Sequence, residues 1–497
     1  MSVDNKIFIE RFSKYLYILV LALILLLGCF LRIRLYILNP GFHHDEANLA
    51  LNMMNNSFSE LFMPLDRNQI CPPLFLIISK FIYGFLKFNN CAEFSDMLLR
   101  FFPLISGISV MFLFPILLNS IYKNKLFNLI GTLVLALNRF AVYYSCVFKQ
   151  YSFELLIAVL IMLIFYNLNL SKENFNKNIF LFILLGLSPL LSYSSYFFII
   201  GIAIYLIYSY FKSRENCILY YLIAVILPAF IIGLLVILPS YFLNKAFMGA
   251  YWHHKFELNF IDFIQVLFYP NIYDFNFNYL YISIAIVISC GIMLKENLKL
   301  FLIVCFPFII TFLSCYYSMY PAEERLLLFI YPSFIIIFLF IISMIKIFRS
   351  CYINIIFNCL ILLYLCNFIL YPTATVDYIL KPDVARDVWE YFYKNYDGNT
   401  PVIFAGSKNS QEYYSKFFPV NRTSYSFSNN MSCLKLYNKI HPGTYYIIAN
   451  FGKYNNLYLR RKLLADTNIL EYKIFVSPWI INRSKNGWYI KFEKKHF

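Results

Sequence analysis

Charged residues are scarce in this chain. Only 14% of its 497 residues are Asp, Glu, Lys or Arg, whereas 61% are hydrophobic and the mean hydropathy is +0.64. Soluble domains contain about a quarter charged residues, so this composition excludes an ordinary soluble protein. The long apolar runs predict a polytopic α-helical membrane protein.

Glycine-rich loops and paired cysteines are also lacking. The chain has 15 glycines with no phosphate-binding loop among them, and its 12 cysteines are scattered without a Cys-x-x-Cys pair. These absences argue against nucleotide binding and against a cysteine metal site. The net charge of +16 does not indicate a nucleic-acid partner, because cytoplasmic basic loops and anionic membrane lipids explain it equally well.

Eleven apolar segments approach the length of about 20 residues that a bilayer span needs. If the N-terminus is cytoplasmic, every loop on that side carries Lys or Arg, as the positive-inside rule requires. The short segment 74–88 contains Lys80 and Lys87, so we expect an amphipathic helix on the outer membrane surface. The expected spans are 15–38, 98–121, 126–146, 152–170, 179–193, 196–211, 217–240, 278–294, 300–318, 326–348 and 352–371.

An odd number of spans places the C-terminal part outside the cytoplasm. Residues 372–497 are richer in charge, Gly and Pro, and 383–396 has the apolar spacing of a helix. We therefore expect a transmembrane domain over 1–371, with a first outer loop at 39–97, and a small extracytoplasmic α/β domain over 372–497. Buried strands are predicted at 401–406 and 443–449, and edge strands at 473–476 and 488–492.

A polar run, Gly41-Phe42-His43-His44-Asp45-Glu46-Ala47, follows the first expected span. Ionisable residues beside a bilayer are costly and usually functional. A carboxylate at this boundary can act as a general base, so we predict Asp45 and Glu46 as catalytic residues, one reacting and the other positioning. The alternative is that Asp45 is the N-cap of a surface helix from Glu46 to Met54.

Four of the six histidines fall in two expected outer loops. His43 and His44 stand beside Asp45, and His253 and His254 follow the seventh span. Together they could bind a divalent metal, although histidines at an interface more often bond water or headgroups. No cofactor is certain.

Four cations stand at the outer boundary, where the positive-inside rule expects few. A phosphate is a natural partner, since guanidinium matches its oxygens bidentately; snorkelling to lipid headgroups is the alternative. Among nearby acids, Glu154 could face the site, and Glu323 or Glu324 could pair with Arg325. The four cations are Arg100, Arg139, Lys149 and Arg325.

Several motifs around these residues occur in a particular order. They are Asp45-Glu46-Ala47, Pro72-Pro73-Leu74, Leu99-Arg100-Phe101-Phe102-Pro103, Tyr143-Tyr144-Ser145 with Lys149-Gln150-Tyr151, Glu324-Arg325-Leu326-Leu327 with Tyr331-Pro332, and Lys381-Pro382-Asp383-Val384-Ala385-Arg386. This order resembles the bacterial members of the protein O-mannosyltransferase superfamily. The superfamily includes the aminoarabinose transferases that modify lipid A. Its members are membrane glycosyltransferases of the GT-C class, similar to glycosyltransferase family 39.

The resemblance implies a polyprenyl-phosphate-linked sugar donor, transfer on the outer face and inversion at the anomeric carbon. Carried over to this chain, Asp45 would deprotonate the acceptor hydroxyl, with Glu46 as its loop partner. Arg325, and with it Lys149, would hold the donor phosphate. The chain departs from the family at Leu326, where Tyr is frequent, and at Cys71 and Lys149, where Arg or His is frequent. Glu154 has no clear counterpart.

We therefore predict an inverting glycosyltransferase of the cytoplasmic (inner) membrane, whose acceptor is a lipid, a protein or a glycan. A surface-glycan polymerase or ligase is an alternative with the same donor chemistry. A transporter is an alternative of another class. It should carry charged or broken helices at mid-membrane in repeated halves, and the sequence has no internal repeat.

Overall fold

The computed structural model divides the chain into two compact units. The helical unit comprises Met1–Tyr36, Phe58–Ile78 and Phe101–Pro372, and the loop–sheet unit comprises Ile37–Ser57, Ser79–Arg100 and Thr373–Phe497. The unit boundary at 372/373 lies next to the predicted domain boundary, but two segments of the expected outer loop group with the C-terminal residues. The structure describes residues 3–86, 91–170, 172–252, 259–268, 279–345, 385–398, 400–406, 412–418, 424–427, 443–450, 467–475 and 487–494.

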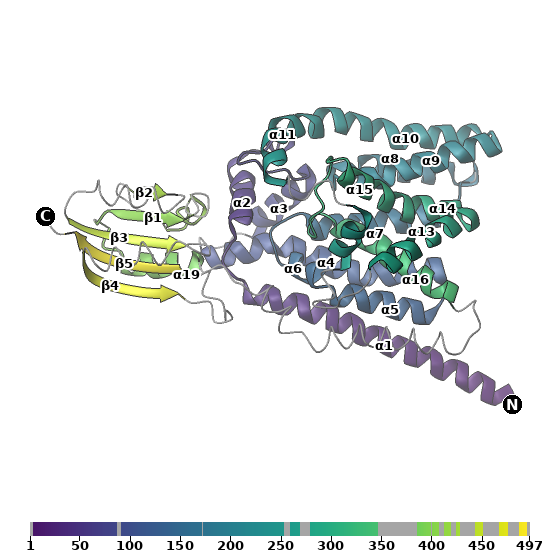
Figure 1. Cartoon of the computed structure of the whole chain (residues 1–497), viewed down its shortest axis with the longest axis horizontal. Helices are drawn as coiled ribbons and strands as arrows, with labels where there is room; N and C mark the ends of the chain where they lie inside the picture. The colour runs from purple at the N-terminus through teal and green to yellow at the C-terminus, as the bar shows by residue number, and fades with distance from the viewer. Residues whose placement is uncertain are drawn as a thin grey trace. The chain divides into compact units, whose positions relative to one another are not determined.

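Helices account for nearly all of the described residues before position 346 (Figure 1). Among the described residues, five helices are long and apolar enough to cross a membrane: Lys14–Leu38, Ala92–Tyr122, Ser195–Ser213, Asn216–Lys245 and Leu298–Tyr316. Large apolar side chains are exposed along them, including Leu26 at 66% and Leu235 at 70%. Such surfaces suit a hydrocarbon environment, so the chain is a polytopic helical membrane protein.

The helices follow one another with short connections. They are α1 (Val3–Leu38), α2 (His44–Asn55), α3 (Pro73–Leu86), α4 (Ala92–Tyr122), α5 (Lys125–Leu137), α6 (Arg139–Tyr144), α7 (Tyr151–Asn167), α8 (Phe175–Leu187), α9 (Ser195–Ser213), α10 (Asn216–Ile232), α11 (Leu238–Trp252), α12 (Phe260–Phe268), α13 (Tyr279–Glu296), α14 (Leu298–Leu300), α15 (Phe306–Tyr316), α16 (Tyr331–Ile345) and α19 (Ala385–Asn395).

Each of the first ten predicted spans overlaps a helix, and the eleventh, 352–371, lies outside the described residues. One predicted span is divided: 126–146 consists of α5 and α6. The division falls at Asn138, because its side chain accepts a hydrogen bond from the Ala141 N–H (2.8 Å) and so starts a new helix. The expected surface helix is α3, whose place at a membrane surface stays a prediction.

Two glycines allow close helix crossings in the helical unit. A Cβ at Gly186 of α8 would lie 2.7 Å from the Val225 carbonyl oxygen of α10, and one at Gly201 of α9 would lie 2.1 Å from the Leu302 carbonyl oxygen. Small residues at crossings let membrane helices pack backbone to backbone. Lys299 adds a cation at the end of α7, where its Nζ donates to the Leu168 carbonyl (2.6 Å).

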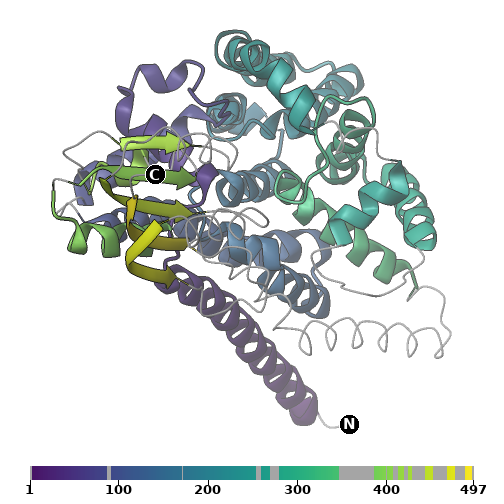
Figure 2. The ribbon, with the colours of Figure 1, turned by 60° about the vertical axis from the view of Figure 1, so that its left-hand side comes forward.

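The C-terminal strands of the loop–sheet unit form a five-stranded sheet of order β2-β1-β3-β5-β4 (Figure 2). β2, β1 and β3 are parallel, while β5 runs antiparallel to both β3 and β4. Both predicted buried strands are present, but the segment expected as an edge strand at 488–492 is interior. The strands are β1 (Val402–Gly406), β2 (Ser424–Phe427), β3 (Gly443–Asn450), β4 (Thr467–Phe475) and β5 (Gly487–Lys494).

Helix α19 packs against this sheet. Its buried face carries Trp389 and Phe392, which are 4% and 0% exposed. The Phe392 ring meets the Tyr446 ring of β3 edge to face, with 5.6 Å between centroids. The charged residues of α19 lie on its other sides, which gives the helix the amphipathic pattern expected for 383–396.

Candidate active site

Asp45 lies in the first turn of α2. Helix α1 ends at Leu38, and Asn39 follows with a φ of 35°, a left-handed conformation that asparagine adopts more readily than most residues. The backbone turns there, and α2 begins at His44. The Asp45 side chain is partly exposed. It stands at the positive end of the helix dipole, which stabilises a carboxylate.

His43 is the N-cap of α2. The Asp45 N–H donates to His43 Nδ1 (3.5 Å) and the His43 N–H donates to Glu46 Oε2 (3.1 Å), which completes a capping box. The alternative in which Asp45 caps a helix beginning at Glu46 is therefore wrong. The helix begins two residues earlier, because the His43 ring can accept the bond.

Glu46 is bonded to Arg100 in a bidentate ion pair. Arg100 Nε donates to Glu46 Oε1 (2.9 Å) and its Nη2 to Oε2 (2.8 Å), while the two residues are 1% and 3% exposed. A buried pair is stable only when its other donors are also satisfied. Arg100 Nη1 donates to Asn39 Oδ1 (3.1 Å) and to the Pro40 carbonyl, and the guanidinium carbon lies 4.8 Å from the Phe42 ring centre.

This geometry changes the role expected of Arg100. The sequence predicted a cation facing a donor phosphate, but the guanidinium is buried against Glu46 instead. Glu46 is correspondingly the positioning member of the acidic pair, because both of its carboxylate oxygens are bonded to Arg100. Asp45, the partly exposed neighbour, is the carboxylate that a substrate can approach.

A second buried carboxylate, Asp96 of α4, lies in the same unit and is 0% exposed. Its Oδ1 accepts from the Tyr413 hydroxyl (2.8 Å), and its Oδ2 accepts from the Tyr414 hydroxyl (3.1 Å) and from Arg386 Nη1 (3.3 Å). We name these four residues the Asp96 cluster. Burial lowers the pKa of Arg386, but the nearby carboxylate of Asp96 more than offsets this and the pKa is raised. The cluster therefore holds a charged pair.

The histidines do not form a metal centre among the described residues. His43 and His44 are exposed, and His44 Nε2 lies 3.3 Å from Asn48 Nδ2. No group of three or more His, Cys, Asp or Glu side chains with metal-binding geometry occurs in the described ranges. The other predicted pair, His253 and His254, lies outside them. No catalytic step below is assigned to a metal.

Lys149 and Glu154 lie close together in the helical unit. Lys149 Nζ donates to Gln69 Oε1 (2.6 Å), and the two residues are 8% and 9% exposed. Burial raises the pKa of Cys71 well above its usual value; Lys149 acts against this rise and Glu154 adds to it. Both charges therefore lie within electrostatic reach of one thiol. Glu154 itself, in the first turn of α7, is 6% exposed.

Arg325 is within electrostatic reach of the same group of aromatic residues. Burial raises the pKa of Tyr144 far above its usual value, and Arg325 opposes this. The Tyr144 ring meets that of Tyr151 edge to face, with 4.9 Å between centroids. Burial likewise raises the pKa of Tyr320, and Glu154 adds to the rise. The fold thus gathers Lys149, Glu154 and Arg325 around buried tyrosines.

The remaining boundary residues are more covered or more peripheral. Arg139 begins α6 and is 2% exposed, with its guanidinium carbon 4.9 Å from the Phe140 ring centre. Glu324 is partly exposed and lines a narrow recess with Phe140 and Tyr331. Phosphate binding by Arg139 and an accessory role for Glu324 stay predictions.

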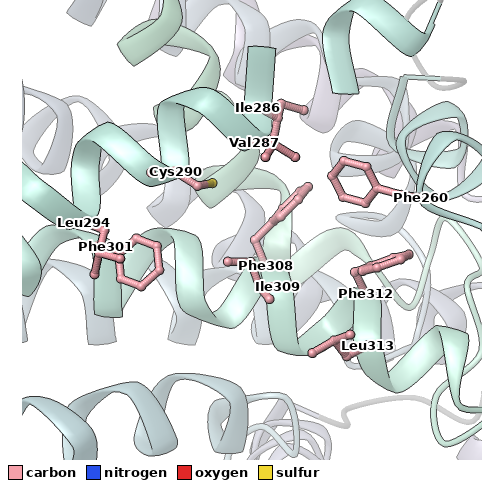
Figure 3. A pocket seen from close by; sticks show the side chains of 11 residues that line it. Phe260, Ile286, Val287, Cys290, Leu294, Phe301, Phe308, Ile309, Phe312 and Leu313 are labelled. Atoms are coloured by element: carbon pink, nitrogen blue, oxygen red, sulfur yellow. The ribbon is translucent and has the colours of Figure 1, made fainter. Parts of the chain in front are cut away.

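A cavity of about 420 Å³ lies among α12, α13 and α15 (Figure 3). Phe260, Val287, Cys290, Phe308 and Phe312 are among the side chains that line it. None of its lining residues carries a charge, so this cavity holds no acid, base or phosphate ligand. The chemistry must lie with the polar residues described above.

No family model matches the chain, and no curated protein matches its sequence. Solved structures do. The structure of ArnT from Cupriavidus metallidurans bound to undecaprenyl phosphate is similar, with a TM-score of 0.49 and 9% identity over 96% of this chain and 98% of that one. The Archaeoglobus fulgidus oligosaccharyltransferase, in complex with Zn and sulfate, has a TM-score of 0.47 and 12% identity over 94% and 72%. The aminoarabinose transferases that the motifs resemble are thus represented among these similar structures.

Sequence reasoning missed the Asp96 cluster. Asp96 looked like an ordinary acid before a span, and Tyr413 and Tyr414 stood among 43 tyrosines. The one available signal was Arg386, in the motif that opens the C-terminal domain. Its partner was not predictable, because Asp96 lies 290 residues earlier in the chain.

Proposed function

We propose that this protein is an inverting glycosyltransferase of the cytoplasmic membrane. It transfers a sugar from a polyprenyl phosphate to a hydroxyl of a lipid, protein or glycan on the outer face. One observation carries the proposal: Asp45 is a partly exposed carboxylate whose neighbour Glu46 is fixed by a buried bidentate pair with Arg100. A base held at a helix start by a rigid neighbour suits proton abstraction.

In the proposed reaction, Asp45 takes the proton of the acceptor hydroxyl. The acceptor oxygen forms a bond to the anomeric carbon, and the bond from that carbon to the phosphate oxygen breaks on the opposite side. The electron pair stays on the polyprenyl phosphate, which gains a negative charge. Lys149 and Arg325 would stabilise that charge, because fixed cations aimed at a leaving group lower the barrier.

The topology that fits this reaction has a cytoplasmic N-terminus and an extracytoplasmic C-terminal domain. The loop that carries Asp45 is then on the outer side, as transfer to a surface acceptor needs. The positions of Lys and Arg in alternate loops support this orientation.

The proposal is tested by mass spectrometry of envelope lipids, proteins and glycans. A strain without the gene is complemented with the wild type, with Asp45→Asn or with Glu93→Gln. Glu93 is the matched control, since it is an exposed acid in the first turn of another helix of the same unit. We expect a sugar mass that disappears on deletion and returns with the wild type and Glu93→Gln. With Asp45→Asn its rate of return should fall about 10²- to 10⁴-fold.

Each contrary result has a definite meaning. Full restoration by an Asp45→Asn variant would remove Asp45 as the base. An envelope unchanged by deletion would contradict sugar transfer altogether. Equal abundance and equal Tm of the Asp45→Asn and wild-type proteins in detergent would show that the lost activity is chemical and not a loss of folding.

A further inference from the structure

Two side chains from the C-terminal part of the chain hold the segment that leads to Asp45. Arg386 Nη2 donates to the Asn39 carbonyl oxygen (2.9 Å), and the Phe42 N–H donates to the Tyr414 hydroxyl oxygen (2.7 Å). These partners lie 347 and 372 residues apart in sequence. Both bonds are made to the backbone, so they fix where the segment runs whatever its side chains do.

Both anchors are themselves fixed by Asp96. The Tyr414 hydroxyl, while accepting from Phe42, donates its proton to Asp96 Oδ2, and Arg386 bonds the same oxygen. Tyr414 is 0% and Arg386 8% exposed. Polar groups buried in this way are costly to leave unmade, so the bonds form as a set.

The Phe42 ring completes the arrangement. It is stacked on the Tyr413 ring, with 4.9 Å between centroids and 25° between planes, and it also contacts the Arg100 guanidinium. His43, the N-cap of α2, follows Phe42 directly. A shift of Phe42 would therefore be passed to the first turn of α2, where Asp45 lies.

We propose that the C-terminal domain positions the proposed catalytic base. Tyr414 and Arg386 are positioning residues that hold the backbone of segment 39–42 and so set the place of Asp45. This inference rests on the proposed role of Asp45. A displacement of about 1 Å at a reacting group can lower a rate about 100-fold, which gives the domain a role in the rate without a residue that touches substrate.

The test compares Tyr414→Phe with Tyr413→Phe in the full chain. Each variant removes one buried hydroxyl that bonds Asp96, and each keeps its aromatic ring. Only the Tyr414 hydroxyl also bonds the segment that leads to Asp45. Tyr413→Phe is therefore a matched control for the loss of a bond to Asp96.

Hydrogen exchange of the peptide covering 39–46, measured on the purified protein in detergent, reports the position of the segment without any substrate. We expect exchange in Tyr414→Phe about two- to tenfold faster than in Tyr413→Phe, because the Phe42 N–H loses its partner. Equal exchange in the two variants would overturn the inference. If Tyr414→Phe does not accumulate, Arg386→Lys takes its place. It keeps the charge beside Asp96 but replaces the guanidinium fork with one nitrogen.

The activity arm uses the rate at which the envelope sugar returns after induction. Tyr414→Phe should lower it about 10- to 100-fold, and Tyr413→Phe less than threefold. In an Asp45→Asn background, Tyr414→Phe should add nothing, because a positioning residue acts only through its target. An equal further loss in that background would overturn the inference. Full activity of Asp45→Asn alone would instead refute the proposed base and leave the exchange result standing.

Discussion

The two polar clusters of this protein treat their buried charges differently. In the loop–sheet unit, the carboxylates of Glu46 and Asp96 are bonded by the guanidinium groups of Arg100 and Arg386. In the helical unit, Lys149 donates to the neutral amide of Gln69. Charges neutralised inside the protein hold the structure, whereas a cation on a neutral amide keeps its charge for an incoming anion.

The difference separates residues that shape the site from residues that stabilise a reaction. Arg100 and Lys149 both stood at the predicted outer boundary, and sequence alone assigned both to a phosphate. Their partners divide them: removing the partner of Arg100 should unfold the protein, while replacing Lys149 should spare folding and slow the reaction.

The largest effect is expected for Glu46→Gln. The change leaves the buried Arg100 charge without its carboxylate partner, and breaking such a pair costs about 3–5 kcal/mol. We expect a large fall in Tm and in the amount of folded protein in detergent. The measurement is thermal unfolding followed by intrinsic fluorescence.

The double variant Glu46→Gln with Arg100→Met provides the control. It removes both charges, and replacing a buried pair with uncharged side chains is often nearly neutral. We expect it to recover most of the Tm that the single variant loses. A double variant no more stable than Glu46→Gln would mean that the pair does not act through its charge.

Much of the fold was predictable because apolar length decides it. The first ten expected spans all overlap helices, and the strands at 401–406 and 443–449 are present. The sheet edge was not predictable. β5 is interior because it pairs with both β3 and β4, and the edge strand β2 was missed. Strand order depends on pairing between distant segments, and a local pattern carries no record of it.

The site was predictable only as far as local sequence reaches. Asp45 and Glu46 stood out because acids beside a span are rare, and Glu46 is indeed held in place. The cap was assigned to the wrong residue, since a histidine N-cap is unusual and Asp45 is a common one. The partners of Arg100 and Arg386 lie 54 and 290 residues away, so only the fold identifies them.

A smaller effect, on rate instead of stability, is expected for Lys149→Gln. Loss of a cation that stabilises a leaving phosphate should slow sugar transfer about 10²- to 10³-fold. Tm should not fall, because a buried charge is removed and no carboxylate is left alone. Lys149→Arg, which keeps the charge, should retain most of the rate. The rate of return of the envelope sugar measures both, and an undiminished rate in Lys149→Gln would exclude Lys149 from the reaction.

The smallest effect is expected for Glu390→Gln, which tests the comparison at its exposed limit. Glu390 lies 3.7 Å from Arg386, but its side chain is 33% exposed, so solvent screens the pair and its worth is under about 1 kcal/mol. Burial raises the pKa of Glu390 and Arg386 only partly opposes this. A carboxyl whose pKa is higher in the folded state loses stability as the pH rises through that pKa. Glu390→Gln should therefore match or slightly exceed the wild-type Tm at pH 7, and the difference should vanish near pH 4, where the wild-type carboxyl is protonated. A fall in Tm at pH 7 would mean that Glu390 belongs with Asp96 among the structural charges.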